Sequence, residues 1–489
     1  MNLLWPPETL AIAAGARSTR PFGAGGVSID SRTLGPGDLF VALRGEHRDG
    51  HEFVADALAR GAAGAMVHRV PPGLAPDSPL LVVSDTLEAL QRLGEFARAR
   101  SRARVTAITG SVGKTTTKEM LRRILEAVAP GQTHAARASY NNQWGVPLTL
   151  AGLPADAAYA VLEIGMNHPG EIAPLAALAR PHVAVITAIE KVHIGFLGSL
   201  EAIADEKASL LSALEVGGVA VLPRDTPFLP RLMASLPPNR RVLTFGAGPL
   251  ADIRLIEAEP EPGATNVLAA VRGQIVHFRL GAAGRHLAFD SLAALGCAAA
   301  LGLDPETAAA LEGFQPLPGR GARRRLMLSG GEALLLDESY NASAPSVRAA
   351  LSVLALQPGR RVAVLGDMLE LGEFANEEHL SLASDLARSA DLVFACGPMM
   401  STLFESLPRA LQGGVSADAE GLAPIVASAI APGDAVLVKG SLGSRMHRII
   451  AALSASVLPP TFVACGNKRK GISRPLKIKA GVPTTDASR

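Results

Sequence analysis

The sequence predicts an α/β protein of three domains, in which the two larger units each contain a parallel sheet. Three observations support this prediction. The chain has 489 residues, and roughly 150 residues per domain is a common size. Short apolar stretches of strand length alternate with stretches in which apolar residues recur at helical spacing, which is typical of parallel sheets covered by helices. Proline and glycine cluster at Pro316–Gly321, where we expect a linker.

Composition narrows the classes of protein that fit this chain. Aromatic residues make up only 4% of the sequence, whereas proteins that stack nucleic-acid bases usually need more. Lys and Arg number 47 against 45 Asp and Glu, a net charge of +2, so no polyanion-binding surface and no nucleic-acid partner are expected. The 3 cysteines are widely spaced, which excludes a disulfide framework and a cysteine-based zinc site.

Membrane insertion and export are not expected either. The apolar run Ser291–Leu303 is too short for a membrane span, which needs about 20 residues. The stretch Met1–Ala14 lacks an early positive charge and contains two adjacent prolines, so it does not resemble a signal peptide. The sequence therefore predicts a cytoplasmic protein.

Residues 1–100 are predicted to form the first, small α/β unit. Its expected strands are Asp38–Leu43, Gly64–His68 and Leu80–Ser84, and its expected helices are Glu52–Arg60 and Thr86–Arg100. Residues 101–315 are predicted to form a central, doubly wound unit. Its expected strands are Arg104–Thr109, Tyr159–Gly165, His182–Ile189 and Gly218–Leu222, and its expected helices are Lys114–Val128, Glu171–Ala179, Leu200–Leu214 and Arg285–Leu301. A hairpin is expected within Val267–Leu280, where Gly273 marks the turn.

Residues 316–460 are predicted to form a smaller, Rossmann-like parallel α/β unit. Its expected strands are Ala333–Asp337, Arg361–Gly366, Leu392–Cys396 and Ala435–Lys439, with helical segments between them. Residues 461–489 hold an excess of Lys and Arg. We expect them to form a disordered, solvated tail.

The strongest local signal is a glycine-rich loop between an expected strand and an expected helix. It consists of Thr109, Gly110, Ser111, Val112, Gly113, Lys114, Thr115 and Thr116. In such a loop the backbone N–H groups face phosphate oxygens, the lysine reaches the β- and γ-phosphates, and a hydroxyl can hold Mg²⁺. The complete pattern has glycine where this chain has Ile108, so the match is partial. The loop predicts binding of nucleotide phosphates but does not choose between a kinase, a GTPase and a ligase.

Two further polar residues follow apolar strands of the same unit. Glu163 ends one expected strand, and His193 comes shortly after another. Because the carboxyl ends of parallel strands meet at the ligand crevice, both side chains are candidates for holding a second Mg²⁺ beside the phosphates. Taken alone, Glu163 is equally compatible with a structural role, and His193 with an ordinary surface histidine.

Several segments together resemble the Mur ligase family, the ATP-dependent amino acid and peptide ligases of peptidoglycan precursor synthesis. The resemblance covers about residues 25–450, and its segments are Thr109–Thr116, Tyr140–Leu150, Leu162–Ile172 and the DESYNAS and KGS runs that begin at Asp337 and Lys439. The run Gly366–Glu373, with His379 after it, is similar to the members that add D-alanyl-D-alanine. The Asn-Pro-Arg motif typical of the diaminopimelate-adding members is absent.

The resemblance implies which residues bind the substrates, UDP-MurNAc-tripeptide, D-Ala-D-Ala and ATP. Contacts to UDP-MurNAc-tripeptide are implied for Ser31, Arg32, Glu46, His47 and Asn142. Contacts to ATP are implied for the glycine-rich loop and for Arg320, Asp337, Tyr340 and Asn341. Lys439 is a candidate for holding the carboxylate of the dipeptide or a phosphate. Taken alone, the Asp30-Ser31-Arg32 run is only a turn with a surface arginine.

The resemblance also implies a metal site with two Mg²⁺ ions. Its expected ligands are Thr115, Glu163, His193 and Lys207, and the expected catalytic residues are Lys114, His193 and Lys207. Lys207 falls on a lysine that the family carbamylates, and a carbamate is an anion with oxygen atoms that can bind Mg²⁺. The acidic residue usual two positions later is Ser209 here. An unmodified Lys207 would be an ordinary helix lysine.

Other departures from the family pattern concern the adenine region. Leu287 and Asp290 stand where the family often has asparagine, and so does Ala188. The usual Asn-Pro after the Tyr-Asn pair is replaced by Ser343-Ala344. The phosphate and metal groups are intact, so these departures affect adenine contacts and affinity more than the reaction.

The expected reaction joins D-Ala-D-Ala to UDP-MurNAc-tripeptide through an acyl phosphate. Two alternatives remain at this stage. One is another ligase of the same fold, such as a folylpolyglutamate-type or diaminopimelate-adding ligase, against which the Gly366–Glu373 run argues. The other is a P-loop binding protein with slow hydrolysis, against which the expected metal set argues. No obligate protein partner is implied.

Overall fold

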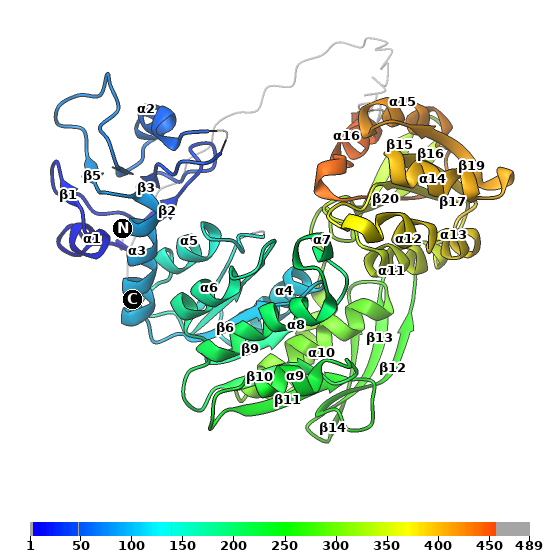
Figure 1. Ribbon diagram of the computed structural model, residues 1–489, viewed down its shortest axis with the longest axis horizontal. Helices are drawn as coiled ribbons and strands as arrows, with labels where there is room; N and C mark the ends of the chain where they lie inside the picture. The colour runs from blue at the N-terminus through cyan, green and yellow to red at the C-terminus, as the bar shows by residue number, and fades with distance from the viewer. Residues whose placement is uncertain (1–2, 47, 138, 456–489) are drawn as a thin grey trace, which may run out of the picture.

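The computed structural model describes residues 3–46, 48–137 and 139–455, and they form three α/β units that each contain one sheet. In Figure 1 the N-terminal unit lies at upper left in blue, the central unit below it in cyan and green, and the C-terminal unit at upper right in yellow and orange. His47 and the predicted tail at 461–489 lie outside the described residues. Within the described ranges, no helix is long and apolar enough to cross a membrane.

The N-terminal unit contains a five-stranded sheet of order β1-β5-β4-β3-β2, parallel except where β1 meets β5. Its elements are α1 (Pro7–Ala14), β1 (Arg17–Ser18), β2 (Gly26–Ser28), β3 (Asp38–Val41), η1 (Gly50–Phe53), α2 (Val54–Ala59), β4 (Gly64–Val67), β5 (Leu80–Val82) and α3 (Thr86–Arg100). Helix α3 begins where the Asp85 carboxylate accepts the backbone N–H groups of Leu87 and Glu88 at 2.7 and 2.9 Å, a common N-cap arrangement.

The central unit contains a nine-stranded sheet of order β14-β13-β12-β11-β10-β9-β6-β8-β7. Its elements are β6 (Arg104–Thr109), α4 (Lys114–Val128), β7 (Thr133–Ala135), α5 (Gly145–Ala151), β8 (Tyr159–Glu163), α6 (Ile172–Ala179), β9 (Val183–Ile186), α7 (Ile194–Leu197), α8 (Leu200–Ala208), η2 (Ser209–Ala213), β10 (Val219–Pro223), α9 (Leu229–Ala234), β11 (Arg241–Gly246), β12 (Ile253–Pro260), β13 (Thr265–Val271), β14 (Gln274–Leu280), α10 (Arg285–Ala300) and η3 (Pro305–Gly313).

The position of β6 determines where a ligand can bind in this sheet. Strands β7 to β12 run parallel, and β6 lies between β8 and β9. The chain order therefore reverses around β6, and the carboxyl ends of such strands form a crevice there. The glycine-rich loop leaves β6 at this crevice and leads into α4. The predicted hairpin is confirmed, because β13 and β14 pair antiparallel.

The C-terminal unit contains a six-stranded sheet of order β15-β16-β20-β17-β18-β19, in which only the β15–β16 pair is antiparallel. Its elements are β15 (Ala322–Leu328), β16 (Gly331–Glu338), α11 (Ala344–Ala355), β17 (Arg361–Gly366), η4 (Gly372–Phe374), α12 (Ala375–Leu380), α13 (Ala383–Ser389), β18 (Leu392–Cys396), α14 (Pro398–Ser406), η5 (Arg409–Leu411), β19 (Gln412–Ser416), α15 (Ala419–Ala429), β20 (Ala435–Lys439), η6 (Leu442–Ser444) and α16 (His447–Ala455).

Two predicted helices are each divided in the structure. The segment predicted as a helix over Glu52–Arg60 is the 3-10 turn η1 followed by α2. The segment predicted as a single helix over Leu200–Leu214 is α8 followed by the 3-10 turn η2. At the change of helix type the Ser209 hydroxyl donates to the Glu206 carbonyl at 2.6 Å, and the Ser212 hydroxyl donates to the Ser209 carbonyl at 2.7 Å. Such side-chain bonds to nearby carbonyls compete with the regular helical pattern.

Candidate active site

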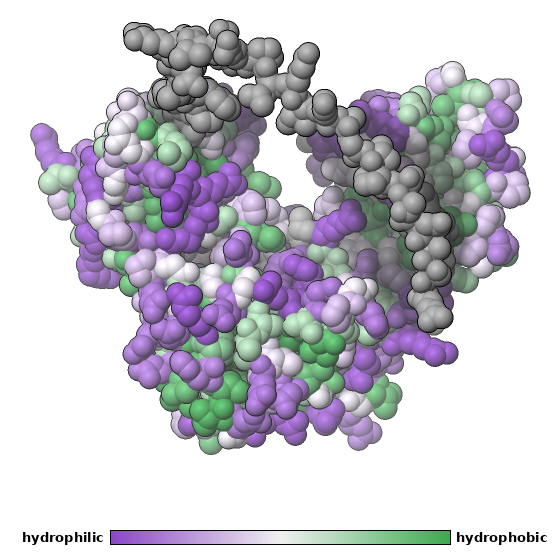
Figure 2. Space-filling view, turned by 180° about the vertical axis from the view of Figure 1, so that it is seen from behind, coloured by the Kyte–Doolittle hydropathy of each residue, from purple (hydrophilic) through white to green (hydrophobic). Residues whose placement is uncertain are grey.

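All three units line one cleft of about 1100 Å³. In the space-filling view, the two outer units stand apart above the central unit, with an open gap between them (Figure 2). Glu46 reaches the cleft from the N-terminal unit, and Lys114 and Glu163 reach it from the central unit. Tyr340 and Lys439 line it from the C-terminal unit.

The glycine-rich loop has the backbone geometry that its glycines permit. Gly113 has φ 83°, and a Cβ atom at this position would lie 2.3 Å from a carboxylate oxygen of Asp290. The loop is tied to the next strand, because the Thr187 hydroxyl donates to the Val112 carbonyl at 2.5 Å and the Ser111 N–H donates to the Ala188 carbonyl at 2.8 Å. These contacts hold the loop at the start of α4.

Two lysines near this loop have lowered pKa values. Lys114 curls over its own loop, and its Nζ donates to the carbonyls of Gly110 at 2.6 Å and Ser111 at 3.2 Å. Burial lowers the pKa of Lys114 to about 8, the Glu163 carboxylate opposes this change, and the Arg320 guanidinium adds to it. Burial and the nearby Lys114 ammonium hold the pKa of Lys207 well below its usual value. The amine of Lys207 is therefore disposed to lose its proton.

Glu163 ends β8 and is buried beside the start of α4. Its carboxylate accepts the Thr115 hydroxyl at 2.9 Å and the Asn141 side-chain amide at 2.8 Å. The Lys118 ammonium lies 3.7 Å from a carboxylate oxygen of Glu163. It donates a hydrogen bond to the Ala136 carbonyl at 2.9 Å. The Glu163 carboxylate and the Thr115 hydroxyl are oxygen donors of the kind that Mg²⁺ prefers beside phosphates.

In the described structure, neither of the other two predicted metal ligands forms a hydrogen bond or ion pair with Thr115 or Glu163. Within the described ranges, no three His, Cys, Asp or Glu side chains come close enough together to hold a metal ion. His193 has φ 59°, and its Nδ1 contacts a carboxylate oxygen of Glu370 in the C-terminal unit. Lys207 is 2% exposed, and it would join a metal site as an oxygen ligand only after carbamylation.

The C-terminal wall of the cleft holds Arg320 and the residues after β16. The Arg320 guanidinium donates to the Ser139 hydroxyl of the central unit at 2.8 Å and stacks 4.0 Å from the centre of the Tyr340 ring. Asp337 is buried and accepts the Ser339 hydroxyl at 2.6 Å. Lys439 is also buried, and its Nζ donates to Glu338 at 3.2 Å and to the Asn341 carbonyl at 3.1 Å.

The predicted UDP-binding residues are only partly at the cleft. Asn142 lines it and accepts the Gly145 N–H at 3.0 Å, which helps to begin α5. Arg32 is exposed and pairs with Asp30 at 2.7 Å, and Ser31 beside it is buried. Neither Ser31 nor Arg32 is part of the cleft lining in the described structure.

Sequence reasoning missed several residues of the site. The sequence patterns single out Asn142 but not its neighbour Asn141, and they give Lys118 no role beyond its place in the expected helix Lys114–Val128. The spacing of Lys118 one turn after Lys114 was an available signal, because residues four apart share a helix face. Glu370 was quoted only as part of the Gly366–Glu373 run, and nothing in the sequence pairs it with His193.

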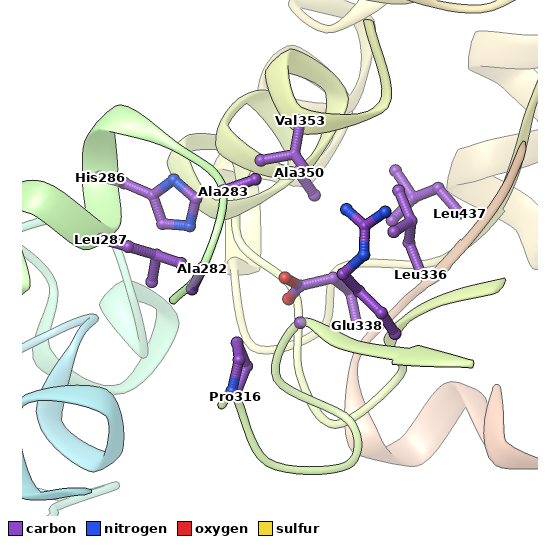
Figure 3. A pocket seen from close by; sticks show the side chains of 12 residues that line it. Ala282, Ala283, His286, Leu287, Pro316, Leu336, Glu338, Ala350, Val353 and Leu437 are labelled. Atoms are coloured by element: carbon purple, nitrogen blue, oxygen red, sulfur yellow. The ribbon is translucent and has the colours of Figure 1, made fainter. Parts of the chain in front are cut away.

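A smaller pocket of about 30 Å³ lies where the central and C-terminal units meet. Figure 3 shows His286 and Leu287 on one side of it and Val353, Glu338 and Leu437 on the other. Among the described residues, His286 Nδ1 is buried without a hydrogen-bond partner. Burial lowers the pKa of His286. Burial also raises the pKa of Asp290, one turn further along α10, well above its usual value.

Comparison with known proteins agrees with this architecture. Three family models match the chain: the Mur ligase family catalytic domain at residues 24–98, the Mur ligase middle domain at 108–298, and the Mur ligase glutamate ligase domain at 324–442. The UDP-N-acetylmuramoyl-tripeptide–D-alanyl-D-alanine ligase of Bacillus subtilis is 32% identical, over 88% of this chain and 94% of its own length.

Two solved structures are also similar. MurF from Acinetobacter baumannii is 33% identical with a TM-score of 0.79, covering 92% of this chain and 99% of its own. MurF ligase from Thermotoga maritima in complex with ADP is 27% identical with a TM-score of 0.72, covering 88% of this chain and 97% of its own. The predicted fold class and family are confirmed, and this chain belongs to the Mur ligase family.

Proposed function

We propose that this Mur ligase uses ATP to join D-alanyl-D-alanine to UDP-MurNAc-tripeptide. The observation that supports the proposal most directly is the shared cleft, in which the glycine-rich loop and Glu163 face Arg320 and Lys439 of another unit. The similar proteins named for this reaction and the Gly366–Glu373 run favour D-Ala-D-Ala over a single amino acid as acceptor. A nucleotide-linked substrate and ATP are cytoplasmic metabolites, so we propose a cytoplasmic enzyme.

The three units would divide the substrates among them. Residues 1–100 would bind the uridine diphosphate end through Ser31, Arg32, Glu46 and His47. Residues 101–315 would bind the ATP phosphates, and residues 316–460 would bind the ribose and base and deliver the dipeptide. Neither Ser31 nor Arg32 lines the cleft, so in this proposal the donor would extend beyond the cleft, with its uridine end on the N-terminal unit.

The chemistry needs alignment and charge stabilisation rather than a protein nucleophile. A carboxylate oxygen of the tripeptide attacks the γ-phosphorus of ATP, so that ADP leaves and an acyl phosphate forms. The amine of D-Ala-D-Ala then attacks the acyl carbon, inorganic phosphate leaves, and the nitrogen loses a proton. Lys114 would stabilise the negative charge that develops on the transferred phosphoryl group. Arg320 would hold the nucleotide from the opposite wall, where it stacks on Tyr340.

Metal binding in this proposal begins at the Thr115–Glu163 pair. Bound Mg²⁺ would neutralise phosphate charge and orient the oxygens for transfer. Glu163 is held for this role by Thr115 and Asn141, so its carboxylate does not have to reorient. We propose that Lys207 is carbamylated, because carbamylation requires the neutral amine and the lowered pKa favours that form.

A phosphate-release assay tests the function. Purified protein is given ATP, Mg²⁺ and UDP-MurNAc-tripeptide, and the acceptor is D-Ala-D-Ala, meso-diaminopimelate, L-lysine or L-glutamate. The dipeptide should stimulate phosphate release strongly and the single amino acids should not, because a site built for a dipeptide leaves charged groups unpaired when half of the ligand is missing. If a single amino acid works equally well, the dipeptide assignment is wrong, although a ligase activity would stand.

A further inference from the structure

The Gly366–Glu373 run has no role in the chemistry derived above, yet it meets the central unit at the cleft. The run follows β17, and Leu369 and Glu370 line the cleft. Glu370 has φ 65°, a conformation that is uncommon for residues other than glycine. Its carbonyl accepts the Gly195 N–H of the central unit at 3.1 Å. The backbone of Glu370 is therefore held by a contact between two units, and such unusual conformations cluster at functional sites.

The Glu370 side chain presents a charged oxygen at this place. One carboxylate oxygen, Oε2, contacts His193 Nδ1. The other, Oε1, has no hydrogen-bond partner among the described residues, and the side chain is 40% exposed. A cationic ligand can thus bind Oε1 without displacing His193.

Apolar side chains line the cleft on the same wall as this anion. Leu369 precedes Glu370 and is 44% exposed, and Leu442 is 61% exposed. Leu369 lies against the segment that carries Leu442, because a Cβ atom at Gly443 would come within 2.6 Å of a methyl carbon of Leu369. An anion flanked by exposed leucines fits a small ligand that has an ammonium group beside a methyl group.

We propose that Glu370 binds the ammonium group of the acceptor dipeptide, with Leu369 and Leu442 against its methyl side chains. This inference rests on the proposed function and specifies the acceptor subsite within it. The phosphates and carboxylates of the other substrates are anions that a carboxylate repels. The acceptor carries its only positive charge on the nitrogen that must reach the acyl phosphate, so a carboxylate on the wall opposite the glycine-rich loop would direct that nitrogen inward.

The decisive variant is Glu370→Gln, which keeps the size and removes the charge. Glu373→Gln is the matched control, because Glu373 is an exposed glutamate of the same run that does not line the cleft. Glu370→Asp is the charge-retaining variant. For each protein, KM is measured separately for D-Ala-D-Ala, ATP and UDP-MurNAc-tripeptide, and thermal unfolding checks the fold.

Glu370→Gln should raise the KM for D-Ala-D-Ala about tenfold or more, since a hydrogen bond to a charged group typically contributes that much to affinity. The KM values for ATP and for the donor should change less than about twofold, and Glu370→Asp should recover part of the acceptor affinity. Glu373→Gln should match wild type. Equal increases in all three KM values, or an increase for the donor alone, would overturn the proposal.

Acyl phosphate formation separates this inference from the function on which it rests. Without acceptor, the acyl phosphate is trapped as a hydroxamate with hydroxylamine, and Glu370→Gln should form it at the wild-type rate. A parallel loss of trapping and ligation would mean that Glu370 acts through His193 on the phosphate step, which contradicts acceptor binding. If wild type forms the hydroxamate but D-Ala-D-Ala gives no ligation, then the proposed function fails, whatever the variants show.

Discussion

The two walls of the cleft hold their polar groups differently. On the central wall, Glu163 is buried and is held by Thr115 and Asn141 of its own unit. On the C-terminal wall, Lys439 is likewise held within its own unit, but Arg320 donates across to Ser139 of the central unit at 2.8 Å. Outside the cleft lining, Lys191 pairs with Glu378 across the same two units at 2.9 Å. The bonds within a unit persist when the units separate, whereas the bonds between units are lost.

The N-terminal unit is fastened in a third way. The Trp5 indole N–H donates to the Ala151 carbonyl of the central unit at 2.9 Å, and Trp5 is fully buried. Helix α3 packs along α5, and the closest approaches include Gly94 with Pro147 and Leu150. Buried apolar contacts stabilise a junction more than exposed ion pairs do. Buried apolar packing reaches both outer units, and the C-terminal unit is joined to the central unit by polar bonds as well.

The largest effect should come from the central wall. Lys114→Ala should lower turnover at least about a hundredfold, because one preorganised charge at a reacting centre often contributes that much. The fold should be retained, since Lys114 lines the open cleft, and thermal unfolding checks this. Steady-state rates at saturating ATP provide the measurement. A near wild-type rate in Lys114→Ala would show that the lysine of the glycine-rich loop does not contribute to the reaction.

The second-largest loss of activity should come from substitutions of Lys207, although this side chain is buried. It is 2% exposed, and burial of a charged ammonium is costly. Lys207→Arg and Lys207→Ala should both lose most of the activity, because neither side chain can carry a carbamate. Mass spectrometry after chemical trapping should find one added CO₂ on Lys207 in wild type. Full turnover in Lys207→Arg would make Lys207 an ordinary helix lysine.

Regular elements of all three units could be predicted from the sequence. The bounds of α3, β6, α4, β17, β18 and β20 agree with the prediction residue for residue, because apolar periodicity and glycine placement are local properties. Strand β15 was missed because Arg323, Arg324 and Arg325 make this edge strand polar. Such charges are common on edge strands, where they discourage pairing with another chain, and they hide the apolar pattern.

The cross-unit contacts could not be predicted in this way. The bond between Arg320 and Ser139 joins residues 181 positions apart, and the contact between His193 and Glu370 spans 177 positions. No periodicity links such distant positions. The resemblance to a family supplied roles for His193 and Arg320 separately, but the geometry that pairs them with Glu370 and Ser139 depends on how the units are arranged.

Arg320→Met should cause an intermediate loss of activity. The variant loses a charged hydrogen bond to Ser139 and the stacking on Tyr340, and we expect kcat/KM for ATP to fall about tenfold. Arg325→Met is the control, because Arg325 is 80% exposed and, in the part of the chain that the structure describes, pairs only with Glu332 of its own unit. Kinetics in both variants provide the measurement. An equal loss of kcat/KM in Arg325→Met would mean that the loss of any positive charge lowers activity, and that the contact of Arg320 with Ser139 is not responsible.

The smallest effect should come from Lys191 and Glu378, where the two units share an ion pair with one partly exposed partner. Lys191 is 36% exposed and Glu378 is 13% exposed, and a pair of this kind usually stabilises by less than about 1 kcal/mol. Lys191→Met and Glu378→Gln should each change kcat/KM by less than about fivefold, and the double variant should show no further loss because the two residues act through one contact. The test is a double-mutant cycle in which kcat/KM is measured for wild type, the two single variants and the double variant at low and at high salt. The coupling between the two substitutions should weaken as the salt concentration rises. A loss comparable to that of Lys114→Ala would show that the junction, not the central wall, limits the reaction, and the contrast between the two walls would be wrong.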